Sequence, residues 1–133
     1  MNARQLASEA KSGVYRLDEE PRIAPIQRAA LTRGFRFIYL DGSRVRGKAE
    51  LMRAIKNALS FPAHFGNNWD ALLDMLRDLS WLPAKGYVLL IDNLQLLSDS
   101  NPADYQMAMD VLWDAAQFWQ ERRTDRTLII LVW

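Results

Sequence analysis

Residues 87–91 read YVLLI, five apolar side chains in a row, three of them β-branched or aromatic. A run of this length without a polar residue is typical of a strand buried on both faces, as in parallel sheets covered by helices. Two similar runs lie at residues 35–40, FRFIYL, and 127–132, TLIILV. We therefore expect an α/β fold, with a small three-stranded parallel sheet and helices on both faces.

Helical patterns fill the intervals between these three strands. In the first interval, residues 48–59 and 68–79 form two amphipathic segments, separated at Phe61-Pro62, where a helix should end. The second interval holds one longer helix, at about residues 102–122, with apolar side chains at helical spacing along its inner side. Each crossover between parallel strands should be right-handed.

The first 34 residues are a different kind of sequence, polar and poor in bulky apolar side chains. We expect residues 1–34 to be an N-terminal extension that packs on or flanks a core domain of residues 35–133. Within the extension, Ala24-Pro25 and Gly34 bracket a short helix, with proline in its first turn and glycine after its end.

The composition limits the classes of function. A chain of 133 residues is long enough for one domain with a single core. It contains no cysteine, which excludes disulfides, thiolate metal sites and a cysteine nucleophile and agrees with a reducing compartment. No run has the apolar length of a signal-peptide core or a membrane span. We therefore expect a cytoplasmic protein with no membrane partner, monomeric when free.

The net charge of +1 hides an uneven distribution. Residues 1–60 carry twelve Lys and Arg against six Asp and Glu, residues 61–121 two against nine, and residues 122–133 three against one. The basic side chains are dispersed through the first 60 positions, so no direct contact with nucleic acid is expected. The acidic stretch favours a basic protein partner, and an ordinary solvated surface is an equal alternative.

Within the acidic stretch, Asp70, Asp74 and Asp78 are spaced by four along the second predicted helix. Residues four apart share one helix face, so neighbouring carboxylates repel each other by about 0.2–0.5 kcal/mol. On a helical wheel, Trp69 and Leu73 lie between this acidic sector and the apolar stripe, so part of the apolar arc can stay exposed. An exposed aromatic side chain beside acids on a rigid backbone is typical of a binding hot spot.

The same row of acids also has a structural explanation. An acid in the first helical turn, such as Asp70, interacts favourably with the helix dipole. Asn67 or Asn68 can cap the helix, and Arg77 can pair with Asp74 three residues away. These interactions explain Asp70 better than Asp74, and as a pattern alone a solvated helix face is the simpler interpretation.

A second motif indicates nucleotide binding. Residues 42–48, GSRVRGK, fit the phosphate-binding pattern G-x-x-x-x-G-K between a predicted strand and a predicted helix, and Asp92 ends another strand, where it could support Mg²⁺. The pattern requires Ser or Thr after the lysine, but Ala49 has no oxygen to bind the ion. Bulky side chains also fill the loop where phosphate must approach the backbone. A nucleotide-binding protein is therefore the weaker alternative.

The residue types give little support to enzyme chemistry. A Ser-His-Asp hydrolase would depend on His64, the only histidine, and no nucleophile-elbow pattern surrounds any serine. Carboxylates along one helix diverge too far to close around a metal ion, and they do not face each other across a cleft as glycosidase carboxylates do. We predict no enzyme activity, no cofactor and no metal site. His64 and Gly66 are first interpreted as loop and turn residues.

Residues 61–76, FPAHFGNNWDALLDML, resemble the barstar family of intracellular ribonuclease inhibitors through the pattern P-x-x-[FY]-G-x-N-x-D-A-L-x-D-x-L. The similarity covers about residues 35–133 and agrees with that family's three-stranded parallel sheet. The resemblance implies a protein that binds a basic ribonuclease and blocks its active site with an acidic helix and the loop before it. An acidic-helix module with a different protein partner remains the alternative.

The resemblance also implies which residues contact the partner. Asp70 and Asp74 match the family's acidic positions, which engage the enzyme's phosphate-binding cations. Other matches lie in the loop and at the helix start, and Asp114 on the long helix is the nearest candidate for a further acid. The predicted partner-binding residues are His64, Gly66, Asn68, Trp69, Asp70, Leu73, Asp74, Asp78 and Asp114.

Three of these residues depart from the family pattern. His64 replaces a tyrosine that is common at its position, and Leu73 and Asp78 stand where barstar has tryptophan and glycine. The partner surface is therefore expected to differ from that of barstar itself.

Overall fold

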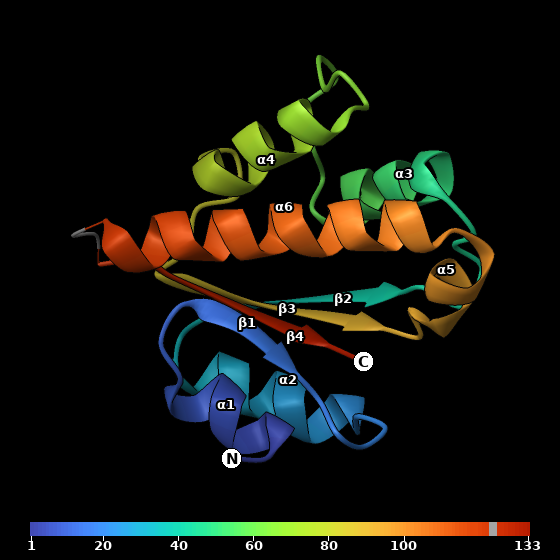
Figure 1. The fold of residues 1–133 in the computed structure, drawn as a ribbon. Coiled ribbons are helices and arrows are strands. Elements are labelled where there is room, and N and C mark those ends of the chain that lie inside the picture. The colour runs from blue at the N-terminus through green and yellow to red at the C-terminus, as the bar shows by residue number, and fades with distance from the viewer. Residues whose placement is uncertain (123–124) are drawn as a thin grey trace.

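The computed structural model describes residues 1–122 and 125–133. These residues form one sheet of four parallel strands in the order β1-β4-β3-β2 (Figure 1). In chain order the elements are α1 (Ala3–Glu9), β1 (Gly13–Arg16), α2 (Ile23–Thr32), β2 (Arg36–Asp41), α3 (Lys48–Ala58), α4 (Trp69–Asp78), β3 (Gly86–Asp92), α5 (Gln95–Ser100), α6 (Pro102–Glu121) and β4 (Thr127–Val132).

The expected number of strands is wrong, because the N-terminal segment supplies a fourth strand. β1 pairs in parallel with β4 along its whole length. Just before it, the buried Ser12 accepts a hydrogen bond on its Oγ from the backbone N–H of Leu128 at 3.0 Å. The first 34 residues therefore contribute an edge strand to the same sheet as the three predicted strands.

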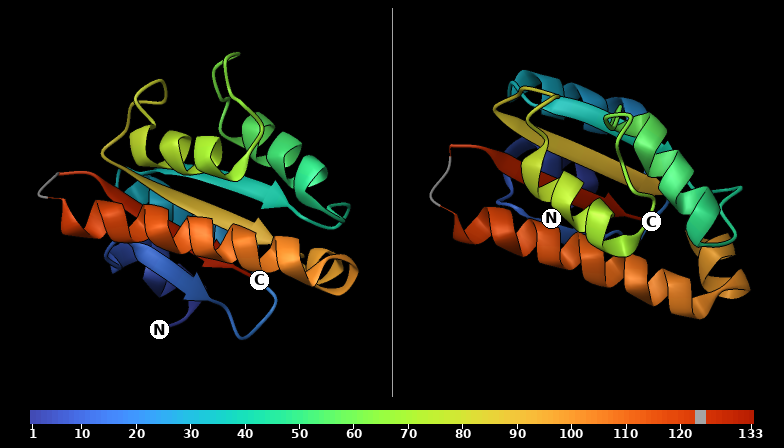
Figure 2. Two further views of the ribbon diagram at one scale, coloured as in Figure 1. Left: turned by 45° about the horizontal axis from the view of Figure 1, so that its top comes forward. Right: turned by 90° about the horizontal axis from the view of Figure 1, so that it is seen from above.

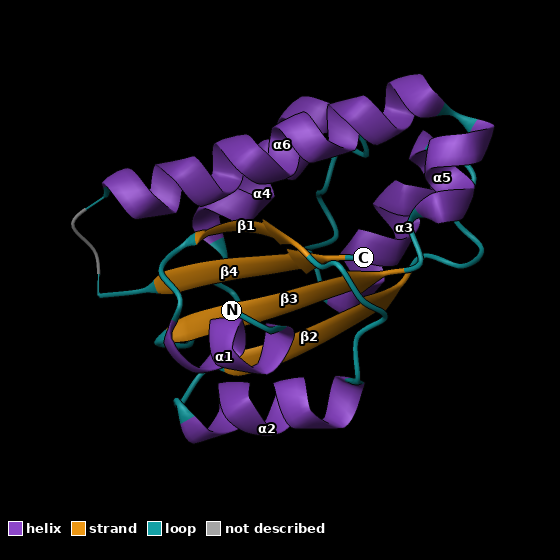
Figure 3. Cartoon of the chain, turned by 60° about the horizontal axis from the view of Figure 1, so that its bottom comes forward, coloured by secondary structure: helices purple, strands orange, loops and turns teal. Residues whose placement is uncertain are grey.

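Helices cover both faces of the sheet. α1 and α2 lie on one face, and α3, α4 and α6 lie on the other (Figures 1 and 3). β3 is buried along its whole length, which explains the uninterrupted apolar run in its sequence. The prediction of a parallel sheet between helices is confirmed.

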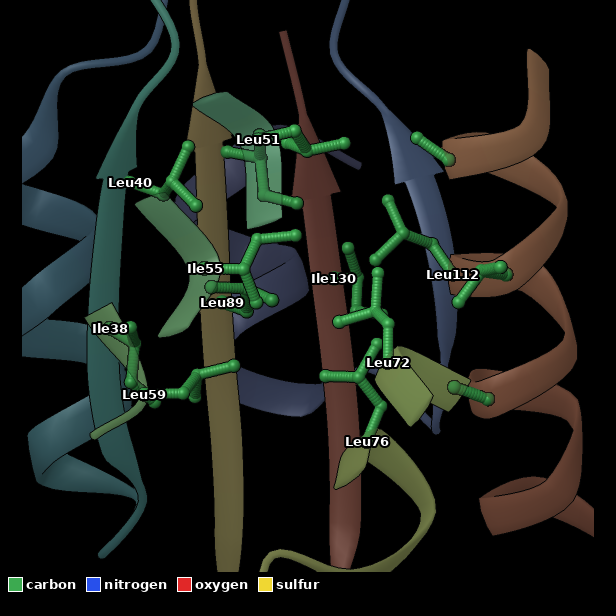
Figure 4. Close-up of a cluster of buried hydrophobic side chains, with 14 of the residues drawn as sticks. Ile38, Leu40, Leu51, Ile55, Leu59, Leu72, Leu76, Leu89, Leu112 and Ile130 are labelled. Carbon is green, nitrogen blue, oxygen red and sulfur yellow. The ribbon is translucent and has the colours of Figure 1, made fainter. Parts of the chain in front are cut away.

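The strands direct alternate side chains into two apolar clusters. In the larger cluster, Leu72 and Leu76 of α4 and Leu112 of α6 gather over Ile130 of β4 (Figure 4). On the opposite face, α1 contacts β4 and α2 contacts β2. The smaller cluster there consists of Leu6, Ala7, Ala10, Ile26, Ala30, Phe35, Val88, Leu90, Ile129 and Leu131.

The four helices expected from the sequence are present as α2, α3, α4 and α6, with ends close to the predicted ones. Two short helices, α1 and α5, were not expected. α1 starts with a capping box, in which the side chains of Asn2 and Gln5 each accept a hydrogen bond from the other residue's backbone N–H. None of the described helices combines the length and apolar character that crossing a membrane requires.

Candidate functional site

α4 begins with a side-chain cap. The Oδ1 of Asn68 accepts a hydrogen bond from the backbone N–H of Ala71 at 2.8 Å, and its Nδ2 donates to the carbonyl of Gly66 at 3.4 Å. Of the two asparagines proposed as caps, Asn68 is therefore the one that acts, whereas Asn67 takes a left-handed conformation with φ of 54°. Gly66 and Asn68 are both exposed.

Buried aromatic side chains anchor the loop before α4. Phe61 and Phe65 are buried and meet edge to face, with 4.9 Å between ring centroids. Phe61 meets Trp81 in the same way at 5.5 Å. In the sequence His64 lies between the two phenylalanines, and its side chain is exposed. The loop therefore presents His64 from an anchored backbone.

Asp70 and Asp74 are exposed, one turn apart on α4. Within the described part of the chain, neither carboxylate accepts a hydrogen bond or forms an ion pair. Asp74 and Arg77, both described, do not form the ion pair that their spacing allows. The guanidinium of Arg77 lies instead over the ring of Phe118 on α6, with 5.3 Å from Cζ to the ring centroid. Packing between the two helices thus turns the nearest cation on α4 away from Asp74.

Asp78 differs from the other two acids. Its Oδ1 accepts a hydrogen bond from the backbone N–H of Ser80 at 3.3 Å, and its carbonyl accepts one from Arg126 at 3.3 Å. Both contacts lie where α4 ends at Leu79, whose φ is 53°. The predicted row therefore divides in two. Among the described residues Asp70 and Asp74 have no side-chain partner, whereas the carboxylate of Asp78 accepts a hydrogen bond at the end of α4.

Trp69 and Leu73 lie where the helical wheel places them, between the acids and the core. Both are partly buried and pack against the larger apolar cluster. The Nζ of Lys48, at the start of α3, lies 5.8 Å from the centroid of the Trp69 ring. The Trp69 ring is therefore positioned by the apolar cluster and by a cation–π contact, and part of it stays exposed.

Asp114 lies on α6, the helix that packs alongside α4 (Figure 2). Its carboxylate is exposed and makes no hydrogen bond or ion pair with residues 1–122 or 125–133. The predicted site residues therefore come from one loop, from α4 and from the adjacent α6.

The phosphate-binding motif is not organised to hold phosphate. The side chain of Val45 is buried in the core. Five backbone N–H groups of residues 42–48 donate to acceptors within the protein at 2.7–3.1 Å, namely those of Gly42, Ser43, Val45, Arg46 and Lys48. These amides would have to be free to cradle a phosphate group. The geometry therefore argues against nucleotide binding at this loop.

One of these acceptors is a structural residue that the sequence analysis missed. Gly47, the N-cap of α3, has no side chain, and the Oδ2 of Asp104 on α6 accepts the N–H of Lys48 at 2.8 Å in its place. The backbone N–H of Asp104 in turn donates to Asn101 at 3.2 Å. Because the cap comes from another helix, no local sequence signal could reveal it.

A separate polar cluster lies at the carboxyl ends of β2 and β3. The hydroxyl of Tyr39 donates to the Oδ2 of the buried Asp92 at 2.9 Å. Burial, and then this hydrogen bond, raise the pKa of Tyr39 to about 12. Hydrogen bonds from the backbone of Ser43 and then from Asn93 lower the pKa of Asp41. By strand alternation this cluster faces α1 and α2, away from α4.

Comparison with known proteins gives one family match. Residues 35–130 match the sequence model of the family described as Barstar (barnase inhibitor). The matched segment contains β2, β3, α3, α4, α5, α6 and the loop before α4, and it leaves out α1, β1 and α2. No curated protein matches the chain.

Proposed function

Because the chain belongs to the barstar family, we propose that it is a protein inhibitor that binds a basic ribonuclease and blocks its active site with α4 and the loop before it. The main observation behind this proposal is that Asp74 is exposed and that Arg77 does not pair with it. Its carboxylate is exposed on a capped helix, while the nearest cation of that helix, Arg77, is held over Phe118. A carboxylate without a cation partner in residues 1–122 and 125–133 is available to a cation of another molecule.

A ribonuclease active site must attract phosphates, so it presents cations. Asp70 and Asp74 offer two fixed negative charges one helical turn apart, which take the place of the RNA backbone. Because the cap and the buried loop aromatics already hold α4 in place, little conformational entropy is lost on binding. Opposite charges also steer the encounter, an effect for which the barnase and barstar pair is itself the reference example.

The apolar part of the proposed surface supplies the rest of the binding energy. Trp69 and Leu73 are partly buried in the free protein, so a partner that covers them removes their remaining apolar area from water. We assign the surrounding contacts to the exposed loop residues and to the more distant acids. These are His64, Gly66, Asn68, Asp78 and Asp114. We further propose that the protein acts in the cytoplasm as a monomer, without catalytic activity or a cofactor.

Capture of the partner tests this proposal. The full chain is immobilised, incubated with native lysate, and the bound fraction is assayed for RNA cleavage with and without added free chain. We expect a captured ribonuclease whose activity falls to background when the free chain is in excess. The Asp74→Ala chain, immobilised in parallel, should capture much less of it. Stable capture of a protein without ribonuclease activity would assign the acidic helix to another class of partner and reject the proposal.

A further inference from the structure

We infer that the flank of α3 is a second, basic half of the partner surface, and that it receives carboxylates of the same ribonuclease that α4 binds. This inference rests on the proposed function and adds the chemistry of the partner. The ribonuclease should carry an acidic patch beside its cationic active site.

The flank of α3 borders a surface hollow of about 510 Å³. Its lining residues are Lys48, Ala49, Met52, Arg53, Lys56 and Asn67. Five of the six come from α3 at spacings that place them along one side of the helix. Three of those five are cations, so the hollow has a strongly positive wall.

The charges of this wall are not neutralised by the described part of the protein. None of Lys48, Arg53 and Lys56 forms an ion pair with residues 1–122 or 125–133. The acid of α3, Glu50, instead accepts the backbone N–H of Arg46 at 3.1 Å. Asp104, which lies near the start of α3, accepts the backbone N–H of Lys48 at 2.8 Å. Glu50 and Asp104 therefore serve the backbone, and none of the three cationic side chains has a carboxylate partner among the described residues.

The hollow is continuous with the α4 surface. Asn67, one of its lining residues, directly precedes Asn68, the cap of α4. The Nζ of Lys48, another lining residue, lies 5.8 Å from the centroid of the Trp69 ring. The loop that leads into α4 runs beside α3 in both views of Figure 2. A specific protein interface covers about 800 Å² on each partner, so a protein seated on Trp69 and Asp70 also reaches the hollow.

The combination of charges selects the kind of ligand. An RNA strand carries only negative charge along its backbone, so the phosphates next to one held in the hollow would meet Asp70 and Asp74. A uniformly basic protein would be repelled by Lys48, Arg53 and Lys56. A protein with a cationic cleft beside an acidic patch satisfies both halves, and such a two-sign pattern also fixes the orientation in which the partners dock.

Charge reversal on α3 tests the inference. The full chain carrying Arg53→Glu and Lys56→Glu is compared with wild type for binding to the purified ribonuclease obtained by capture. The control carries Lys11→Glu and Arg28→Glu, which make the same change in net charge at exposed sites in the loop between α1 and β1 and in α2, outside the proposed surface. We expect the Kd to rise by about tenfold or more for the α3 variant, because like charges then face each other, and to change by less than about threefold for the control.

A second variant tests whether the effect of the two glutamates comes from disruption of α3 and not from their charge. Arg53→Gln with Lys56→Gln removes both charges, keeps good helix formers, and should raise the Kd by a smaller factor in the same direction. A Kd equal to that of the control for both α3 variants, or tighter binding, would overturn the inference. The inference would also be overturned if a single-stranded RNA oligonucleotide bound the wild-type chain through Lys56 while the α3 variants bound the ribonuclease as tightly as wild type does.

The Asp74→Ala chain separates this inference from the proposed function. If Asp74→Ala weakens binding and the α3 variants do not, the inhibitor proposal stands and the basic half of the surface is rejected. If Asp74→Ala leaves the affinity unchanged, or if no ribonuclease is captured, the inhibitor proposal fails and the inference that rests on it fails too.

Discussion

Asp74 and Arg77 show how tertiary packing changes the meaning of a local pattern. Their spacing permits an ion pair on the helix, worth about 0.2–0.5 kcal/mol in isolation. In the folded chain, stacking of Arg77 on Phe118 occupies the guanidinium instead. The spacing alone favours a helix face whose charges pair with one another. In the part of the chain that the structure describes, Asp70 and Asp74 have no such partner.

From this arrangement we predict that Asp74→Ala weakens binding of the captured ribonuclease by about 2–5 kcal/mol, mainly through faster dissociation. The loss should be large because the cations of the enzyme would remain buried without a partner. Surface plasmon resonance measures both rate constants. Asp18→Ala, which removes an exposed acid near β1 that lies outside the proposed surface, serves as the matched control. Equal dissociation rates for Asp74→Ala and wild type would remove Asp74 from the interface.

Tyr39 gives a prediction about stability and pH. Its pKa is raised to about 12 in the folded protein, so the native state holds the phenolic proton more tightly than the unfolded chain, whose tyrosines titrate near 10. This contribution to stability is complete below pH 10 and is lost as the pH rises from about 10 to about 12. Urea unfolding of the wild-type chain across this range should show the decline.

Tyr39→Phe is the control for that measurement, since it has no phenolic proton to lose. Its stability is expected to be lower at neutral pH, because Asp92 loses a hydrogen bond, but to decline less between pH 10 and 12. If the two proteins lost stability in parallel over that range, another group would be responsible.

At the scale of elements, α4 owes its fixed start to Asn68. We predict that Asn68→Ala lowers the free energy of unfolding by about 1 kcal/mol, because the N–H of Ala71 loses its acceptor. Thermal or urea unfolding measures the change. Asn57→Ala, at an exposed position near the end of α3, is the control and should have little effect. If Asn68→Ala lowered the free energy of unfolding by no more than Asn57→Ala does, the cap would not stabilise α4.

The sequence predicted most elements because their signals are local. Apolar runs marked β2, β3 and β4, and helical periodicity marked α3, α4 and α6. β1 escaped prediction because its four residues, GVYR, contain only Val14 and Tyr15 as strand formers, and an edge strand needs no continuous apolar run. α5 has only six residues, too few to establish a helical period.

The candidate site was predictable in part for the same reason. The row of acids, the cap and the half-buried Trp69 follow from helical geometry and could be read from the sequence. Three other features depend on contacts between distant elements and could not. They are the stacking of Arg77 on Phe118, the capping of α3 by Asp104 and the basic hollow beside α4.

At the scale of the whole molecule, the first 34 residues cover one face of the sheet. Val88, Leu90, Ile129 and Leu131 are fully buried beneath α1 and α2. Burial of each such side chain stabilises a fold by about 1.5–3 kcal/mol. Together they approach the total stability of an ordinary domain, about 5–15 kcal/mol. We therefore propose that residues 1–34 belong to the folding unit of the chain.

Deletion of residues 1–34 tests this directly. We predict that residues 35–133 alone aggregate or unfold without a cooperative transition, because a sheet face of large aliphatic side chains becomes exposed. Near-ultraviolet circular dichroism and thermal unfolding, with the full chain as reference, measure the effect. A soluble fragment with a cooperative transition close to that of the full chain would show that the extension is dispensable for folding.

If α4 occupies the active site of a ribonuclease, this protein and RNA must compete for the enzyme. The most direct measurement is the apparent inhibition constant of the full chain for the captured ribonuclease at rising concentrations of a non-cleavable RNA analogue. We predict that this constant rises in proportion to the analogue once the analogue exceeds its own Kd. A constant that stays the same would mean that the enzyme binds RNA and this protein together, which would contradict a blocked active site.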